Sequence, residues 1–242
     1  MVYTTAYQTE KDSFYVTVGL WQAGQNRIFI DCNVQSPAEM LSPGRIGMTA
    51  ILPVRFTAMN WYGKGPLETY PDRQCGGRMG VYSEDVRNQP FYLRPQEYGL
   101  HMESRCMRLT DPDRADFVRF EAACPMAMSA VPYSDLQLWN ARHPHELPAP
   151  EALYVHLDYA HRGLGNSSCG PDALSAYRID DRPCRFGFAL EAGLGEREDN
   201  PFGPIPEEIP AYHPWKAVEE QDRTPSYRDP SDPDQRSNAG MV

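Results

Sequence analysis

Two polar stretches of this 242-residue sequence carry side chains that could do chemistry. The first, residues 60–73 (NWYGKGPLETYPDR), places Glu68, Asp72 and Arg73 within one short segment. Two carboxylates so close in sequence can serve as a general acid and base, and a carboxylate with a guanidinium can form an ion pair that fixes a loop. The spacing alone favours the ion pair over the acid–base pair.

The second polar stretch is residues 158–171 (DYAHRGLGNSSCGP). His161, Asn166 and Ser168 are the groups there that could reach a ligand hydroxyl, and Cys169 could line a pocket as a small, soft wall. The same polar groups could instead cap the backbone of their own loop, which is a common role of short polar side chains. Both interpretations stay open at this point.

Metal binding and disulfides are not indicated. The sequence holds six cysteines without a C-x-x-C pair, so we expect isolated reduced thiols. No group of histidines and cysteines has the spacing of a zinc site. His101 and His156 fall on predicted strands, where a core position satisfied by neighbours is favoured over a catalytic one.

The elements that must position these groups are mostly strands. Aromatic and β-branched patterns predict strands at 13–18, 27–34, 46–56 continuing to 62, 99–109, 117–123, 152–159 and 185–191. A short helix is predicted at 134–142, with Ser134 as N-cap and Leu138 and Trp139 facing inward. The pattern predicts an all-β protein of antiparallel sheets packed face to face.

The glycines of the first polar stretch are expected to form a turn. We expect a strand to end at Trp61-Tyr62, Gly63 and Gly65 to supply φ freedom, and Pro66 to fix the next φ.

Charge and composition exclude several classes of partner. The net charge of −10 and the pI of about 5.1 argue against nucleic acid and anionic membranes, because both need a concentrated basic face. No stretch approaches the roughly 20 apolar residues of a membrane span, and no export signal is visible, so a cytoplasmic protein is expected. Residues 195–242 combine eight prolines with eleven acidic and five basic residues, which predicts a disordered tail after a domain at 1–194.

The first polar stretch resembles the W-x-G-x-G-P-x-E-x-Y-P-D-R signature of the last domain of glycoside hydrolase family 2 β-galactosidases, the small chain. Its matching positions are Gly63, Gly65, Pro66, Glu68, Tyr70, Asp72 and Arg73. Residues 94–100 (RPQEYGL) resemble the P-Q-E-x-G segment of that domain, and residues 158–171 resemble its D-x-x-x-x-G-x-G loop. The end of the domain is similar to residues 177–179 and to the closing strand at residues 185–190.

The resemblance implies a galactose mutarotase-like antiparallel supersandwich that packs against a separate (β/α)8 barrel. That barrel would carry the two carboxylates of a retaining mechanism and the Mg and Na ions of the enzyme, so no catalytic residue or cofactor is implied on this chain. The 158–171 loop would reach the sugar, where many members present a Trp. Cys169 stands at or beside that position, so the location of the loop is implied and the stacking is not.

The resemblance also implies missing parts. The family's domain begins with further strands, so we expect a sandwich that is truncated at its N-terminal side. We expect no barrel on this chain, because a barrel needs about 200–250 residues. We expect a component that closes the site for terminal β-D-galactosides in lactose catabolism and is inactive alone, with a barrel-bearing chain as partner. The alternative is a non-catalytic carbohydrate-binding or subunit-assembly sandwich. The carboxylate neighbours do not suggest a self-contained glycosidase; they are Glu68–Asp72, Asp111–Asp113 and Asp180–Asp181.

Overall fold

The computed structural model describes residues 1–8, 13–22, 25–35, 42–92, 96–165, 170–179 and 183–195. Its strands are β1 (Val2–Gln8), β2 (Ser13–Gln22), β3 (Arg27–Gln35), β4 (Arg45–Pro53), β5 (Ala58–Gly65), β6 (Arg78–Asp85), β7 (His101–Thr110), β8 (Phe117–Val131), β9 (Ala152–His161) and β10 (Cys184–Gly193). The described helical elements are α1 (Asp135–Asn140) and three 3-10 turns, Val86–Asn88, Pro144–Glu146 and Ser175–Tyr177. Apart from Gly195, the predicted tail lies outside the described residues.

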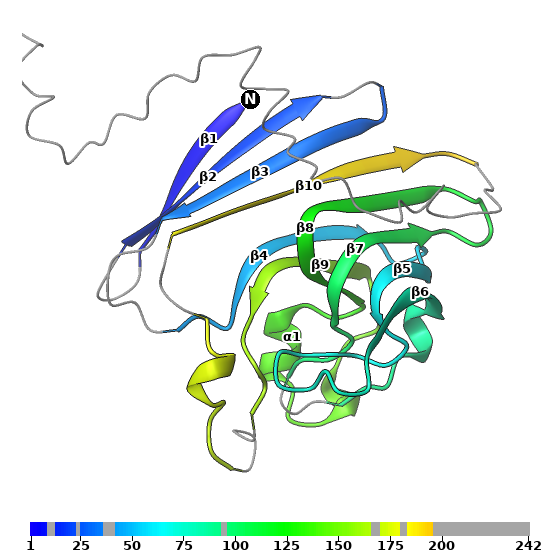
Figure 1. The fold of residues 1–242 in the computed structure, drawn as a ribbon. Helices are drawn as coiled ribbons and strands as arrows, with labels where there is room; N and C mark the ends of the chain where they lie inside the picture. Colours follow the sequence, from blue (N-terminus) through cyan, green and yellow to red (C-terminus); the bar gives the residue numbers. More distant parts are fainter. Residues whose placement is uncertain are drawn as a thin grey trace, which may run out of the picture. The chain divides into compact units, whose positions relative to one another are not determined.

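All named strand pairs are antiparallel. The main path runs β1-β2-β3-β10-β8-β7-β5-β6, and β9 branches from β8 to pair with β4. The branch is possible because β8 is long: residues 117–122 pair with β10, and residues 127–131 pair with β9. The predicted all-β antiparallel class is confirmed (Figure 1).

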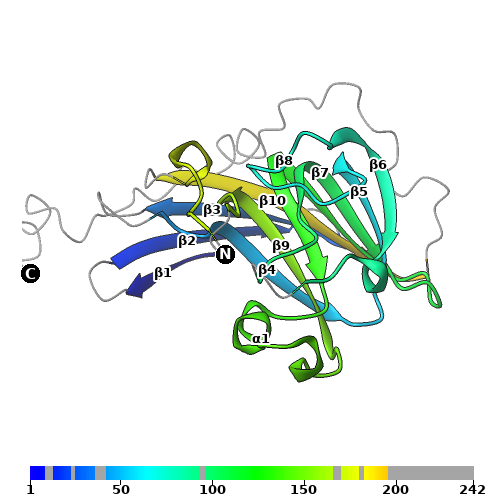
Figure 2. The same ribbon diagram turned by 90° about the horizontal axis from the view of Figure 1, so that it is seen from below.

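The two arms of the sheet pack face to face over one core. In Figures 1 and 2, β4 and β9 lie against the layer that contains β2, β3 and β10. The Sγ atom of Cys32 on β3 lies 3.2 Å from the Sδ atom of Met48 on β4, and the Tyr159 ring of β9 stacks on Phe186 of β10 at 5.7 Å. Alternate residues of β2, β3, β4, β9 and β10 enter this core, as a pleated sheet with one apolar face requires.

Several local expectations differ from the structure. Strands β1 and β6 were not predicted, because residues 2–7 of β1 are exposed and β6 is an edge strand that presents little buried surface. The stretch predicted as one strand from 46 to 62 is two strands, β4 and β5, separated by a turn. In α1, Ser134 forms the predicted cap and Leu138 is buried, whereas Trp139 is 70% exposed, so its predicted inward orientation is wrong.

The predicted turn at Gly63 and Gly65 is also wrong. Strand β5 continues to Gly65, and neither glycine has a positive φ. A Cβ atom at Gly63 would lie 2.6 Å from the Ser104 Oγ atom, and one at Gly65 would lie 2.6 Å from the Tyr82 ring. Glycine is needed here because neighbouring strands approach the backbone closely, and not because the backbone needs unusual φ values.

The described cysteines form no disulfide in the structure; they are Cys32, Cys75, Cys106, Cys124 and Cys184. Within the described part of the chain, no helix is long and apolar enough to cross a membrane.

Candidate functional site

Asp72, from the first polar stretch, holds the beginning of the second. Its carboxylate accepts two hydrogen bonds from backbone N–H groups, one from Leu164 at 3.1 Å and one from Gly165 at 2.6 Å. These partners are 92 and 93 residues away in sequence. A carboxylate that accepts two amide hydrogen bonds fixes both the position and the direction of the backbone that donates them.

The two preceding backbone amides are bound as well, by other segments. The Arg162 N–H donates to the carbonyl of Gly44 at 2.9 Å, and the Gly163 N–H donates to the carbonyl of Tyr177 at 2.8 Å. Four successive amides, those of residues 162–165, therefore each have a partner. The base of the loop that follows β9 is fixed from three sides.

Two glycines make this close approach possible. A Cβ atom at Gly163 would lie 2.8 Å from both the Asp72 Cγ atom and the Tyr177 Cβ atom. Gly165 has a φ of +58°, and a Cβ atom there would lie 2.6 Å from the Ala173 backbone nitrogen. The loop therefore returns close to its own beginning at Ala173, and only glycine fits at the crossing.

Glu68 connects the first polar stretch to residues 96–100. Its Oε2 atom accepts a hydrogen bond from the Gly99 N–H at 2.8 Å, and its Oε1 atom accepts one from Arg73 Nη2 at 2.8 Å and another from the Tyr92 hydroxyl. The ion pair favoured from the sequence is confirmed for Glu68 and Arg73. Gly99 has a φ of +75°, so this turn does require glycine.

Glu97 and His161 form a buried ion pair at the end of β9. The Glu97 Oε2 atom lies 3.7 Å from His161 Nε2 and also contacts the Arg45 guanidinium, and its Oε1 atom accepts a hydrogen bond from the Tyr70 hydroxyl at 3.3 Å. The His161 Nδ1 atom lies 2.7 Å from the Arg162 carbonyl oxygen. Because both ring nitrogens face acceptors, this geometry suits the doubly protonated imidazolium.

The electrostatics of the pair agree with that interpretation. Burial opposes a charged His161, but the hydrogen bond to Glu97 and the negative charges of Glu97 and Asp158 outweigh it, so the pKa of His161 is raised. Burial likewise opposes a charged Glu97, yet the hydrogen bond from His161 and the charge of Arg45 outweigh it and lower the pKa of Glu97. The two shifts favour the charged form of each side chain.

Asp158 lies deeper in the same cluster. Its side chain is 1% exposed, and its Oδ2 atom lies 3.8 Å from Arg45 Nη1. Among the described residues, neither carboxylate oxygen of Asp158 has a hydrogen-bond partner. Burial raises the pKa of Asp158 to about 7, although the positive charges of Arg45 and His161 oppose the shift.

The three stretches that meet here match a known family. The model of the beta galactosidase small chain matches residues 2–190. This chain belongs to that family. Among curated relatives, the beta-galactosidase of Staphylococcus xylosus is 31% identical over 148 residues, and that of Arthrobacter sp. (strain B7) is 34% identical over 168 residues.

Those matches cover 61% and 66% of this small chain but only 15% and 16% of the two relatives. A crystal structure from Escherichia coli K12, described as an aldose 1-epimerase, aligns with a TM-score of 0.42 and 8% identity over 80% of this chain and 65% of that one.

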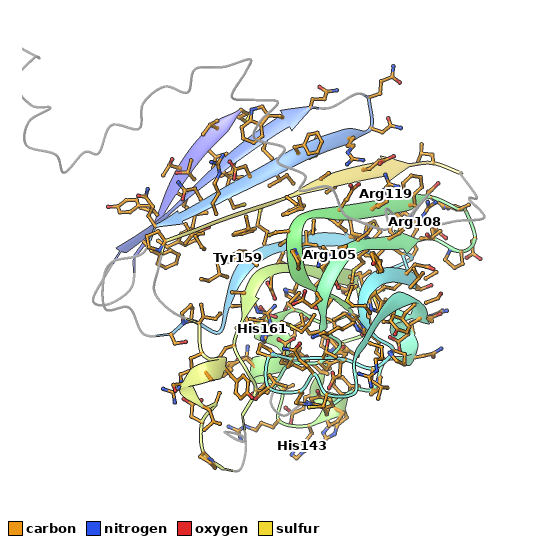
Figure 3. The ribbon with its side chains drawn as sticks, in the orientation of Figure 1. Arg105, Arg108, Arg119, His143, Tyr159 and His161 are labelled. Atoms are coloured by element: carbon orange, nitrogen blue, oxygen red, sulfur yellow. The ribbon has the colours of Figure 1, made fainter. Side chains whose placement is uncertain are left out.

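The remaining predicted site residues of the small chain fall into two groups. His161 is the last residue of β9, and Figure 3 labels its place there. Asn166, Ser168 and Cys169 lie outside the described residues. Of the motif positions, Tyr70 is fully buried and its ring packs edge-on against His161 at 5.5 Å.

His156 and His101 are buried core groups. The Nδ1 atom of His156 lies 3.1 Å from the Thr49 hydroxyl, and its Nε2 atom lies 3.5 Å from Asp135. The His101 ring stacks on Trp61 with centroids 3.8 Å apart. Burial lowers the pKa of each to about 4, so both are neutral at physiological pH.

Other carboxylates of the sequence analysis have structural roles where they are described. The Asp111 Oδ1 atom accepts hydrogen bonds from the amides of Asp113 and Arg114 and so closes its own turn. Asp180 and Asp181 lie outside the described residues. No three His, Cys, Asp or Glu side chains of the described part gather closely enough to hold a metal ion.

The sequence did not indicate the cluster of Arg45, Glu97 and Asp158. Two signals were available: Asp158 is a charged residue at the end of an apolar strand, and Glu97 lies in the P-Q-E segment. Neither signal indicates Arg45. The position of Arg45 follows from the pairing of β4 with β9, in which Arg45 is opposite His161.

Proposed function

We propose that this small chain closes the galactoside site of a β-galactosidase whose catalytic carboxylates lie on a separate barrel. One observation carries the proposal: each pair of the three family stretches is joined by direct contacts. Asp72 binds the amides of Leu164 and Gly165, Glu68 binds the amide of Gly99, and Glu97 pairs with His161. The family signature therefore serves to fix one loop.

The residues of that loop have distinct proposed roles. Asn166 and Ser168 would contact sugar hydroxyls, and Cys169 would line the pocket wall. We assign His161 a role beneath the sugar rather than against it, because both of its nitrogens already have protein partners. This corresponds to the loop-capping alternative for His161 left open above.

Three carboxylates around this loop do not suit catalysis by this chain alone. A retaining glycosidase needs two carboxyl groups about 5–5.5 Å apart, one that attacks the anomeric carbon and one that protonates the leaving oxygen. Glu68 and Glu97 are each occupied by several donors, and Asp158 is shielded from solvent. The proposal therefore assigns bond cleavage, and the Mg and Na ions, to the barrel-bearing partner. A cytoplasmic place in lactose catabolism is part of this proposal, and the role in lactose catabolism rests on the resemblance.

The test combines this chain with a β-galactosidase fragment that has the barrel and lacks the small chain. The chain alone is expected to leave an aryl β-D-galactoside unhydrolysed, the fragment alone to be weakly active, and the mixture to gain on the order of 10²-fold in rate. Deleting residues 163–171 should abolish the gain while the two chains still co-elute in size-exclusion chromatography.

Two results would contradict the proposal. Turnover by the purified chain would place the catalytic groups on it. A stable mixture without any gain in rate would favour the alternative function, a carbohydrate-binding or subunit-assembly sandwich.

A further inference from the structure

Asp72 lies on a segment that is far in sequence from the loop it binds. It follows β5 by seven residues, and the loop amides it binds follow β9. The side chain is half-buried, and it meets the loop through hydrogen bonds and not through the apolar core. A change at Asp72 can therefore alter the loop while leaving the packing between the sheet layers in place.

The contact is specific to a carboxylate. Two N–H groups, from Leu164 and Gly165, point at the two oxygens of one side chain. An asparagine of the same shape offers one carbonyl oxygen, and its NH2 group would face a second donor. The isosteric change thus replaces one hydrogen bond with a donor–donor contact.

Gly163 tests the same contact from the side of the loop. Its Cα hydrogen faces the Asp72 carboxyl carbon and the Tyr177 Cβ atom, and an added methyl group would lie 2.8 Å from each. Alanine at this position must push the loop away from Asp72 or displace Tyr177. Two substitutions on separate segments are therefore expected to disturb one geometry.

We infer that Asp72 is a positioning residue for the galactoside site: its carboxylate sets where the segment Gly163–Gly165 lies when the small chain closes over the sugar. The inference rests on the proposed function. Its consequence is specific, because a misplaced loop weakens contacts with the sugar while the catalytic groups on the partner stay unchanged. The loss should therefore appear mainly in KM.

The experiment compares Asp72→Asn with Asp113→Asn, an identical change of charge at an exposed residue of the β7–β8 turn. Hydrogen exchange of the Leu164 and Gly165 amides is measured by NMR on each chain alone, with the β9 amide of Val155 as reference. Each chain is then combined with the barrel-bearing fragment, co-elution is checked, and kcat and KM are measured for an aryl galactoside. Gly163→Ala is carried through the same steps, so that one poorly folding variant does not decide the result.

The expected result for Asp72→Asn is exchange at least about tenfold faster at Leu164 and Gly165, with Val155 unchanged. In the assembled enzyme, kcat/KM should fall about 10- to 100-fold through a rise in KM. Asp113→Asn should match the wild type in both measurements. A variant that only lowered stability would reduce the amount of active complex and leave KM as it is.

Three outcomes overturn the inference. Unchanged exchange at Leu164 and Gly165 shows that Asp72 does not hold the loop. Faster exchange with an unchanged KM in an intact assembly shows that the loop position does not matter for the sugar. If the wild-type chain brings no gain in rate, the proposed function itself fails and the role at the sugar site falls with it, while the exchange data still report separately on the contact.

Discussion

The carboxylate of Asp158 and the guanidinium of Arg45 face each other at 3.8 Å inside the small chain. Neither Asp158 oxygen has a hydrogen-bond partner in the described part of the structure, and the Arg45 Nη1 atom has none there either. A buried ion pair that leaves its atoms unsatisfied does not recover the cost of removing two charges from water. The charged Asp158 side chain therefore lowers the stability of the fold, and a different side chain on the same backbone could raise it.

Replacement of Asp158 by asparagine should stabilise the chain at alkaline pH. Because the pKa of Asp158 is raised from 3.8 to about 7, the folded state keeps a proton that the unfolded state releases, and stability falls as the pH rises from about 4 to about 7. An asparagine at this position has no such penalty, which is on the order of 4 kcal/mol at pH 8. Urea unfolding at pH 8 and pH 5 should show the larger gain at pH 8; an equal effect at both would contradict the assignment.

Replacement of His101 by phenylalanine should reduce acid sensitivity. Burial lowers the pKa of His101 to about 4, so the unfolded state takes up a proton near pH 6.5 before the folded state does, and stability is lost as the pH falls from 6.5 to 4. Phenylalanine keeps the stack on Trp61 and cannot titrate. The variant should lose about 3 kcal/mol less than the wild type between pH 7 and pH 4, measured by chemical denaturation. Parallel pH profiles for the two proteins would argue against this role.

Replacement of Glu97 by glutamine should uncouple the buried cluster. The change removes the negative charge that contacts both Arg45 and His161, so these two cations lose their common counter-charge. Removing one partner of a buried ion pair typically costs about 3–5 kcal/mol. The pKa of His161, followed by NMR titration, should fall at the same time because its main stabilising partner is gone. A destabilised variant with an unchanged His161 titration would show that the two residues are not coupled.

Replacement of Gly65 by alanine should destabilise the fold through steric overlap. The new methyl group would lie 2.6 Å from the Tyr82 ring and 3.0 Å from the Trp61 ring, which requires a shift of the strands at a cost of about 1–3 kcal/mol. Gly76→Ala is the matched control, because no atom lies within 4 Å of its added methyl group. Thermal unfolding of both variants separates close packing from a general effect of the lost glycine, which would lower both midpoints equally.

Much of the fold was predictable because the signal for strands is local. Alternating apolar residues mark β2, β3, β7, β9 and β10 whatever their neighbours are. The same signal fails for β6, whose outer edge faces solvent, and for Trp139, where a helix of six residues is too short to show which face is buried. Glu68 and Arg73 were predictable as a pair because they are five residues apart.

The order of residues along the chain determines three things: the all-β class of this protein, its family, and the loop that carries part of the family signature. Three contacts depend instead on how the strands pair: Asp72 binds Gly165, Glu97 pairs with His161, and Gly63 lies close to Ser104. The physical reason is the sequence separation over which each kind of interaction acts. Side-chain alternation repeats every two residues and can be read along the chain, whereas a hydrogen bond across 93 residues exists only once β8, β9 and β4 have paired in one register.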